Sequence, residues 1–231
     1  MKSFLIKTVA AAAAALAFGG AQAAIVLDFE NIAPFPNNNN TFVQNFYNGG
    51  TSSNGSSGTN YGISFSANSL AICLNSQTQF CSNTSRGGVA PGSEFGGLFF
   101  LTGNQSIMNV AAGFDTGFSF NYVSVTQRGS VSVFDGLDGT GNLLATLTLD
   151  PNAGSCPGYN AGFCPFSGVG VGFAGTAKSV SFAGVANQIV FDDITFGSII
   201  PGGEGEVPEP ASLGLFGLAL LGAAAARRKS V

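Results

Sequence analysis

The chain has 231 residues, a formal net charge of −4, four cysteines and no histidine. Because histidine is absent, Ser-His and Cys-His catalytic couples are excluded. Residues 24–207 hold eleven acidic and three basic side chains, so this central part is near −8, and its charge disfavours binding to nucleic acid.

Residues 1–23 predict a secretory signal peptide. Lys2 and Lys7 give a basic start, residues 8–18 are almost wholly apolar, and Ala21 and Ala23 are the small residues that flank a cleavage point. A membrane anchor is the alternative, but this apolar run of about 11 residues is shorter than the about 20 that a span needs. We therefore expect an exported protein whose mature chain begins at residue 24.

Residues 24–203 predict one all-β domain, because they are rich in Gly, Ser, Asn, Thr, Val and Phe and show no long stretch at helical spacing. Residues 117–125 alternate apolar and polar side chains, so we expect one face to be buried and the other wet. Ten short strands predict a two-sheet, jelly-roll-like sandwich. The predicted strands are 25–29, 61–66, 98–101, 106–110, 117–125, 130–134, 143–149, 169–173, 178–182 and 188–196.

Three segments between or after these strands predict loops. Residues 36–60 contain an Asn run and a Gly/Ser stretch with little to bury, which predicts a long mobile loop. Residues 135–142 form a Gly-rich hairpin turn, in which we interpret Asp135 and Asp138 as turn residues, with a cation loop as the alternative. Residues 202–206 predict a flexible linker to the C-terminal region.

The four cysteines predict two local disulfides. Cys73 and Cys81 enclose seven residues, and Cys156 and Cys164 enclose seven more, so Cys73–Cys81 with Cys156–Cys164 is the simplest of three pairings. Disulfides also suit an oxidising, exported destination. A zinc site is the alternative, but the chain has no histidine and lacks the close cysteine spacing of zinc ribbons.

The C-terminal region, residues 204–231, combines a Pro-Glu-Pro triplet, the uncharged apolar stretch 211–226 and a basic cluster, 227–229. Sixteen helical residues span about 24 Å, a little less than a hydrocarbon core of about 30 Å, and the basic cluster favours a cytoplasmic end. A simple tail anchor is one interpretation of such a tail.

This tail also resembles the PEP-CTERM sorting signal of Gram-negative bacteria, which has the same three parts in the same order. The resemblance implies recognition by an exosortase, cleavage near the triplet, and a transient inner-membrane anchor followed by display at the cell surface or release. It also implies an organism that builds exopolysaccharide and biofilm. The sorting residues would be Val207, Pro208, Glu209, Pro210, Arg227, Arg228 and Lys229.

Acidic residues stand at both ends of the predicted domain. Glu30 follows the first strand, and Asp192 and Asp193 lie inside the last, where an uncompensated buried carboxylate is costly and a hard cation would compensate it. The arrangement is similar to that of jelly-roll carbohydrate-binding modules that hold a structural calcium. The resemblance implies Glu30 and one of the two Asp residues as ligands, with backbone carbonyls completing the shell. The alternative is a sheet end where both Asp side chains are hydrogen-bonded or solvated.

We assign no catalytic residue. Residues 170–175 satisfy the dinucleotide fingerprint Gly-x-Gly-x-x-Gly, but a strand-like sequence follows and offers no helix N-terminus for a phosphate. A glycosidase needs two carboxylates, and no feature selects a pair.

We therefore expect a non-catalytic surface or extracellular-matrix protein that associates with exopolysaccharide and biofilm. The alternative is a carbohydrate-binding module, with calcium as a possible structural cofactor. Because tryptophan is absent, sugar rings would stack on exposed Phe or on Tyr side chains. The tyrosines are Tyr47, Tyr61, Tyr122 and Tyr159.

Overall fold

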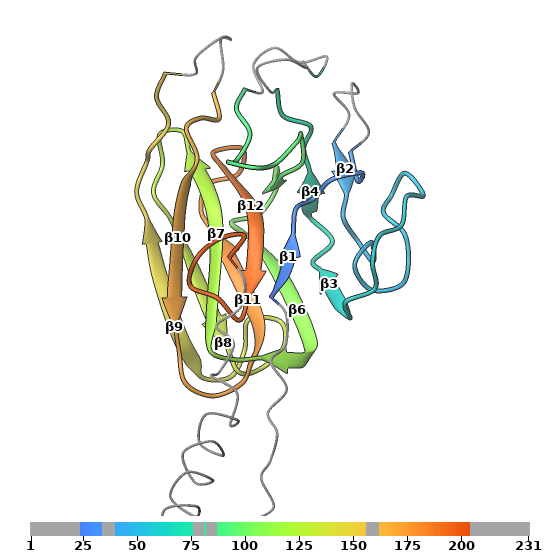
Figure 1. The fold of residues 1–231 in the computed structure, drawn as a ribbon, viewed down its shortest axis with the longest axis vertical. Helices are drawn as coiled ribbons and strands as arrows, with labels where there is room; N and C mark the ends of the chain where they lie inside the picture. The colour runs from blue at the N-terminus through green and yellow to red at the C-terminus, as the bar shows by residue number, and fades with distance from the viewer. Residues whose placement is uncertain (1–23, 34–39, 76–80, 82–86, 156–161, 204–231) are drawn as a thin grey trace, which may run out of the picture. The chain divides into compact units, whose positions relative to one another are not determined.

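Strands and turns, but no helix, make up the part of the chain that the structure describes (Figure 1). In the computed structural model this part comprises residues 24–33, 40–75, 81, 87–155 and 162–203. It falls within one of two compact units, residues 22–206. Over these residues no helix is long and apolar enough to cross a membrane. The apolar stretch 211–226, which we predict to be a membrane helix, lies outside them.

Two antiparallel sheets form a sandwich, as the sequence predicts. The strands of the larger sheet are β1 (Ile25–Leu27), β2 (Thr41–Phe42), β4 (Ser69–Ala71), β5 (Leu98–Phe100), β7 (Gly117–Ser124), β10 (Ser167–Gly172) and β12 (Ile189–Phe196). Those of the smaller sheet are β3 (Ile63–Phe65), β6 (Gln105–Phe114), β8 (Gly129–Phe134), β9 (Leu143–Leu149) and β11 (Ala177–Ala183). The order is β10-β7-β12-β5-β4-β2 in the first, with β1 also paired to β12, and β3-β6-β11-β8-β9 in the second.

All ten predicted strands are present, and their ends differ from the prediction by a few residues. The largest difference is β6, which continues to Phe114 instead of ending at Val110. The short strands β2 and β4 were not predicted. Strand β2 has only two residues, too few to show an alternation, so only its pairing with β4 defines it.

Phenylalanine side chains fill the space between the sheets. Phe118 and Phe120 of β7, Phe182 of β11 and Phe191 of β12 are each 0% exposed. The rings of Phe182 and Phe191 meet edge to face with centroids 4.9 Å apart. Such contacts add about 0.5–1.5 kcal/mol per pair to the burial of the rings themselves, so this layer holds the two sheets together.

Strand β7 differs from the prediction, because all eight of its residues are buried. The expected wet face is covered. Val123 belongs to a second apolar cluster that also contains Phe99, Phe163 and Val190. Further along the strand, Ser119 is 0% exposed beneath residues that follow β12. The alternation is real, but elements distant in sequence cover the polar side.

Residues 40–60 pack onto the core, which differs from the expectation of a mobile loop with little to bury. Phe46 and Tyr47 are each 4% exposed and belong to the main core. The carbonyl of Asn45 accepts the backbone N–H groups of Asn48 and Gly50 at 2.9 and 3.0 Å. Expecting little burial was wrong, because two aromatic residues within a polar sequence are enough to anchor a turn. Residues 36–39 of the predicted loop lie outside the described part.

The Cys73–Cys81 disulfide is present, as predicted from the spacing. It links the end of β4 to Cys81, and both cysteines are almost fully buried. Cys164 is also disulfide-bonded. Its predicted partner Cys156 lies outside the described residues.

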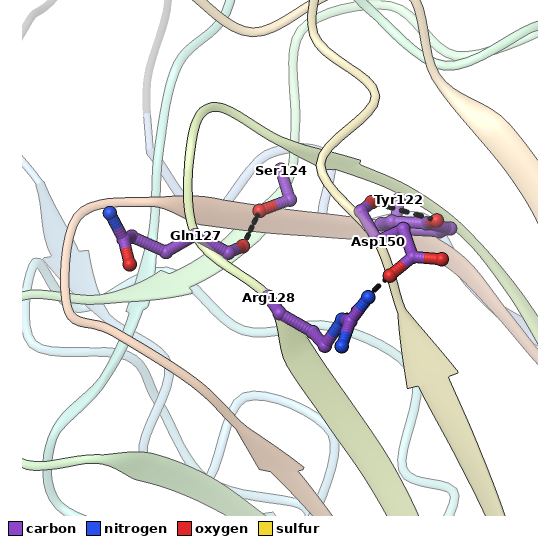
Figure 2. A network of polar contacts seen from close by, with 5 residues as sticks. All are labelled: Tyr122, Ser124, Gln127, Arg128 and Asp150. Carbon is purple, nitrogen blue, oxygen red and sulfur yellow. Dashed lines mark hydrogen bonds and ion pairs between the residues drawn. The ribbon is translucent and has the colours of Figure 1, made fainter.

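A polar network joins the ends of β7, β8 and β9 (Figure 2). Arg128 donates Nε–H to Asp150 Oδ1 at 2.7 Å. Tyr122 donates its hydroxyl to the Asp150 carbonyl at 3.1 Å, and Ser124 donates to the Gln127 carbonyl. The Arg128 and Asp150 side chains are 70% and 66% exposed, so their ion pair contributes at most about 1 kcal/mol. The network therefore fixes the turns at this end of the sandwich.

Candidate functional site

Strand β12 changes its partner part-way along one edge. It pairs with β5 at Phe191 and with β1 from Ile194 onward, and Figure 1 shows β1 alongside β12. The chain leaving β1 and the chain entering β5 therefore meet opposite Asp192 and Asp193. We call this place the β1/β5 junction, and it consists of residues 28–30, 93–96, 192 and 193.

The backbone at the junction has an irregular course. On the other edge of β12, the register with β7 shifts between Asp192 and Thr195, and Asp193 has a φ of 48°. Gly96 lies so close to the turn after β1 that a Cβ there would be 2.5 Å from the Phe29 carbonyl oxygen. The bulge in β12 thus allows two other segments to approach the carboxylates.

Glu30 anchors the segment that enters β5. Its Oε1 accepts the backbone N–H groups of Glu94, Phe95 and Gly96 at 3.0, 2.9 and 2.9 Å. Three converging N–H groups form a nest that favours an anion. Burial nevertheless raises the pKa of Glu30 above its ordinary value, with these hydrogen bonds opposing the rise.

Asp192 is the least satisfied group of the junction. The residue is 0% exposed, and its Oδ1 accepts the Asp193 backbone N–H at 2.8 Å. Its Oδ2 is buried and has no hydrogen-bond partner among the described residues. Burial raises the pKa of Asp192 well above its ordinary value, and the charge of Asp193 raises it further. A buried oxygen of this kind indicates a missing partner.

Asp193 connects several elements. Its Oδ2 accepts the Asn121 side-chain N–H of β7 at 2.8 Å, and its Oδ1 accepts the Ser93 hydroxyl at 3.3 Å. Its main-chain carbonyl accepts the Thr195 hydroxyl at 2.7 Å. Burial raises the pKa of Asp193 as well, although Asn121 and Ser93 oppose the rise.

The carboxyl groups of the junction repel one another. Asp28 contributes to the raised pKa of both Glu30 and Asp193, after burial, and Glu30 contributes to that of Asp192. The ion pair found within the described ranges joins Arg128 to Asp150, so no Arg or Lys there pairs with this cluster. Among the described residues, the protein thus gathers carboxyl groups at one place in the sheet without an Arg or Lys paired to them.

The predicted ligands Glu30, Asp192 and Asp193 all lie at the junction, and their chemistry fits a hard cation. Calcium takes six to eight oxygen ligands, and the unpartnered Oδ2 of Asp192 is an oxygen of the required kind. Main-chain carbonyls of Asp28 and Phe29 lie beside Gly96 in the same junction. No group of three or more Asp, Glu, Cys or His side chains suited to a metal occurs in the described ranges, so carbonyls and water would supply the remaining ligands.

The other candidate residues are used in turns and strands. Asp135 accepts the backbone and side-chain N–H groups of Asn142 at 2.6 and 2.8 Å, which lowers the pKa of Asp135. Asp138 accepts the Asn109 side-chain N–H at 2.7 Å. The Gly-x-Gly-x-x-Gly sequence lies in β10 and the turn before β11, so a strand follows it rather than a helix.

The tyrosines differ in their availability for stacking. Tyr47 is 4% and Tyr122 is 7% exposed, so neither ring can receive a sugar. Tyr61 is 36% exposed and stacks on Tyr47 with centroids 6.2 Å apart. Tyr159 lies outside the described residues.

A cleft of about 380 Å³ lies beside the junction. One wall is formed by residues 88–93 and the other by Ser155, Cys164, Pro165 and Phe166. Ser93 belongs both to this cleft and to the hydrogen-bond shell of Asp193. The lining side chains offer the hydroxyl groups of Ser93 and Ser155 and apolar surface, and none of them carries a charge.

Comparison with known families concerns the C-terminal region. The family model of the PEP-CTERM protein-sorting motif matches residues 206–229. The chain is a PEP-CTERM sorting-domain protein. It is therefore an exported protein sorted to the cell surface, and its motif implies processing by an exosortase.

The sorting residues of this PEP-CTERM protein, from Val207 to Lys229, fall within the matched stretch and outside the described residues. The predicted signal cleavage at Ala21 and Ala23 also lies outside them and stays a prediction. No curated protein matches the chain.

Three solved structures are similar to this PEP-CTERM protein at low identity. The K2 and K3 cleaved adhesin domains of Lys-gingipain, the latter from Porphyromonas gingivalis, are each 14% identical, with TM-scores of 0.41 and 0.35. The alignments cover 76% of this chain and 99% and 98% of those domains. A glycoside hydrolase family 43 arabinoxylan arabinofuranohydrolase from Bacillus subtilis is 18% identical over 55% of this chain, with a TM-score of 0.33. The chain spans 24% of that enzyme. These scores support no inference about function.

Proposed function

We propose that this PEP-CTERM protein is a non-catalytic component of the cell surface or extracellular matrix that associates with exopolysaccharide and biofilm. The sorting motif at residues 206–229 carries the proposal, because it directs the attached domain to the surface. A rigid, disulfide-bonded domain suits that location, since disulfides persist in an oxidising environment. The near −8 charge of residues 24–207 keeps such a domain soluble there.

A gene deletion in the native bacterium tests this proposal. We expect reduced aggregation and biofilm mass, restored by the full-length chain. A chain with Pro208→Ala and Pro210→Ala should stay in the membrane fraction and fail to restore the phenotype, whereas Glu204→Ala, upstream of the matched stretch, should restore it. Normal aggregation and biofilm in the deletion strain would contradict the proposal, and so would release of reducing sugars when the purified protein meets exopolysaccharide.

A second candidate function is calcium-dependent carbohydrate binding. The observation that favours it is the position of Ser93, which contributes to the cleft and also contacts Asp193 at the junction. A cation at the junction would fix the cleft wall formed by residues 88–93. The exposed Pro165 and the half-buried Phe166 would then offer apolar surface to a sugar ring, with Ser93 and Ser155 as hydrogen-bonding groups.

A glycan array probed with and without Ca²⁺ tests this candidate. We expect binding in Ca²⁺ that EDTA abolishes and that Phe166→Ala weakens. Tyr61→Ala is the matched control, because Tyr61 is exposed and does not line the cleft. An array with no binder above background in either condition would eliminate the candidate, and loss of binding with Tyr61→Ala instead would place the sugar elsewhere.

A further inference from the structure

The residues that follow β12 pack against the outer face of the larger sheet. We call residues 198–203 the C-terminal strap, and the end of the coloured ribbon in Figure 1 turns back across β7. A Cβ on Gly170 would lie 2.0 Å from the Ile199 carbonyl oxygen, and one on Gly168 would lie 3.2 Å from Pro201. A Cβ on Gly117 would lie 3.0 Å from the Ile199 side chain. Glycines of β7 and β10 therefore form the surface that receives the strap.

Hydrogen bonds attach the strap to the sheet at both ends. Gly197, just before the strap, donates its N–H to the Gly117 carbonyl at 2.9 Å. At the far end Gly202 donates its N–H to Thr195 Oγ1 at 2.9 Å. The hydroxyl proton of Thr195 is given to the Asp193 carbonyl at 2.7 Å, so Thr195 can only accept from Gly202.

Two features link the β1/β5 junction to the surface under the strap, and only the first includes a hydrogen bond from the strap itself. The first runs from Gly202 through Thr195 to the main chain of Asp193. The second is Asn121, which donates to the Asp193 carboxylate and whose Oδ1 would lie 3.2 Å from a Cβ on Gly168. Both features begin at the residue whose left-handed backbone forms the bulge.

We infer that cation binding at the β1/β5 junction holds the C-terminal strap on the sheet, and so sets how much free chain separates the domain from its sorting motif. This inference depends on the proposed cation site. Without a cation, the crowded carboxylates of Asp192 and Asp193 repel each other and loosen the bulge. Thr195 then loses its fixed acceptor, and the Gly202 hydrogen bond weakens with it.

Release of the strap would lengthen the chain between the folded domain and Pro208. Gly203 and Pro208 are five positions apart in the sequence, and an extended chain of that length spans at most about 17 Å. If the strap is released back to Gly197, the domain ends eleven positions before Pro208, and an extended chain of that length spans at most about 38 Å. Docking of the strap therefore decides how closely the folded domain can be held to the segment that an exosortase processes.

Amide hydrogen exchange of Gly202 in the full-length chain, purified in detergent, tests the inference. We compare EDTA with Ca²⁺ at about 1 mM, the range used by extracellular calcium modules. The melting temperature is measured on the same samples as the readout of cation binding. We expect Ca²⁺ to raise the melting temperature and to slow exchange at Gly202 by about fivefold or more.

Three variants separate the coupling of the strap from cation binding. Thr195→Val removes the hydroxyl with little change in volume, so Gly202 should exchange fast in both conditions while the Ca²⁺-dependent melting shift remains, and Thr195→Ser should restore protection. Gly170→Ala displaces the strap without altering the junction and should give the same result as Thr195→Val.

The possible outcomes distinguish the cation site from its coupling to the C-terminal strap. If Ca²⁺ raises the melting temperature but leaves Gly202 exchange unchanged, the cation site stands and the coupling is wrong. If Thr195→Val keeps its Ca²⁺-dependent protection, the proposed route through Thr195 is wrong. If Ca²⁺ changes neither quantity, the cation site and the coupling both fail.

Discussion

Phe29 donates its backbone N–H to the Tyr47 hydroxyl over 2.9 Å, although 18 residues separate them in the sequence. The two rings also meet edge to face, with centroids 5.8 Å apart. Phe29 has a φ of 55°, which is unusual for a bulky residue. This contact therefore holds the turn that brings Asp28 and Glu30 to the β1/β5 junction.

Tyr47→Phe should destabilise the domain, because it leaves the buried Phe29 N–H without its acceptor while keeping the ring. We expect the free energy of unfolding to fall by about 1–3 kcal/mol, measured by urea denaturation. Tyr61→Phe is the control, since Tyr61 is 36% exposed and water can replace its hydroxyl contacts, and we expect a change within about 0.5 kcal/mol. Equal effects of the two substitutions would show that the Phe29 hydrogen bond is not important.

Most of the fold could be predicted from the sequence, because alternation and turn residues are local signals. They predict ten of the twelve strands and the two-sheet sandwich, but they give no sign of β2, β4 or the burial of Tyr47. The face of β7 that was expected to be wet illustrates the limit. Ser119 and Asn121 are polar, yet the C-terminal strap and the bulge of β12 cover them, and only the tertiary structure shows this.

The candidate site could be predicted in part, for a similar reason. Acidic residues in an apolar strand are a local signal, so Asp192 and Asp193 stand out in the sequence, as does Glu30 after the first strand. Ser93 and Asn121 carry no such signal, because they are polar residues in a loop and in a strand. They join the site only because β12 changes partner and shifts register at this point.

Gly170→Ala and Gly172→Ala should differ, although both glycines lie in β10. A Cβ at Gly170 would lie 2.0 Å from the Ile199 carbonyl, whereas the nearest atom at Gly172 would be 3.5 Å away. We expect Gly170→Ala to lower the free energy of unfolding by about 1–3 kcal/mol. Gly172→Ala should be neutral or stabilising by up to about 1 kcal/mol, since alanine loses less backbone freedom on folding. Similar values for both in chemical denaturation would mean that the strap does not pack on Gly170.

Removal of the Cys73–Cys81 disulfide should lower the free energy of unfolding, because the unfolded chain gains conformational entropy without the bridge. The bridge closes a loop of about nine residues, which corresponds to about 2.5 kcal/mol in the chain-entropy model. Cys73→Ala with Cys81→Ala should lower the free energy of unfolding in urea by that amount or somewhat more, because both buried sulfurs also leave a cavity. The unsubstituted chain under reducing conditions also loses the Cys164 disulfide, so its urea midpoint should lie at or below that of the double variant. A midpoint unchanged by the double substitution would argue against a stabilising role for this bridge.

Asp192→Asn should have opposite effects with and without calcium. In EDTA at neutral pH the substitution removes a buried charge, so we expect the free energy of unfolding to rise by about 1 kcal/mol or more. In Ca²⁺ at a hundredfold excess over its dissociation constant, the unsubstituted chain should gain about 2.7 kcal/mol, and Asp192→Asn should gain little. The order of stability should therefore reverse between the two conditions. Asp115→Asn is the control. Because Asp115 is exposed, this substitution should change the free energy of unfolding by the same amount in EDTA and in Ca²⁺.

The difference in stability between the unsubstituted chain and Asp192→Asn should also depend on pH, which tests the buried charge of Asp192 separately. Burial raises the pKa of Asp192 in the folded state, so its protonated form is favoured there. The stabilisation from this protonation is complete below the ordinary pKa of an aspartic acid and is lost as the pH rises through the raised value. In EDTA the advantage of Asp192→Asn should thus be largest at neutral pH and shrink as the pH falls, in melting curves recorded across that range. An advantage that stays constant with pH would show that Asp192 does not change its charge, and the unpartnered carboxylate at the β1/β5 junction would need another explanation.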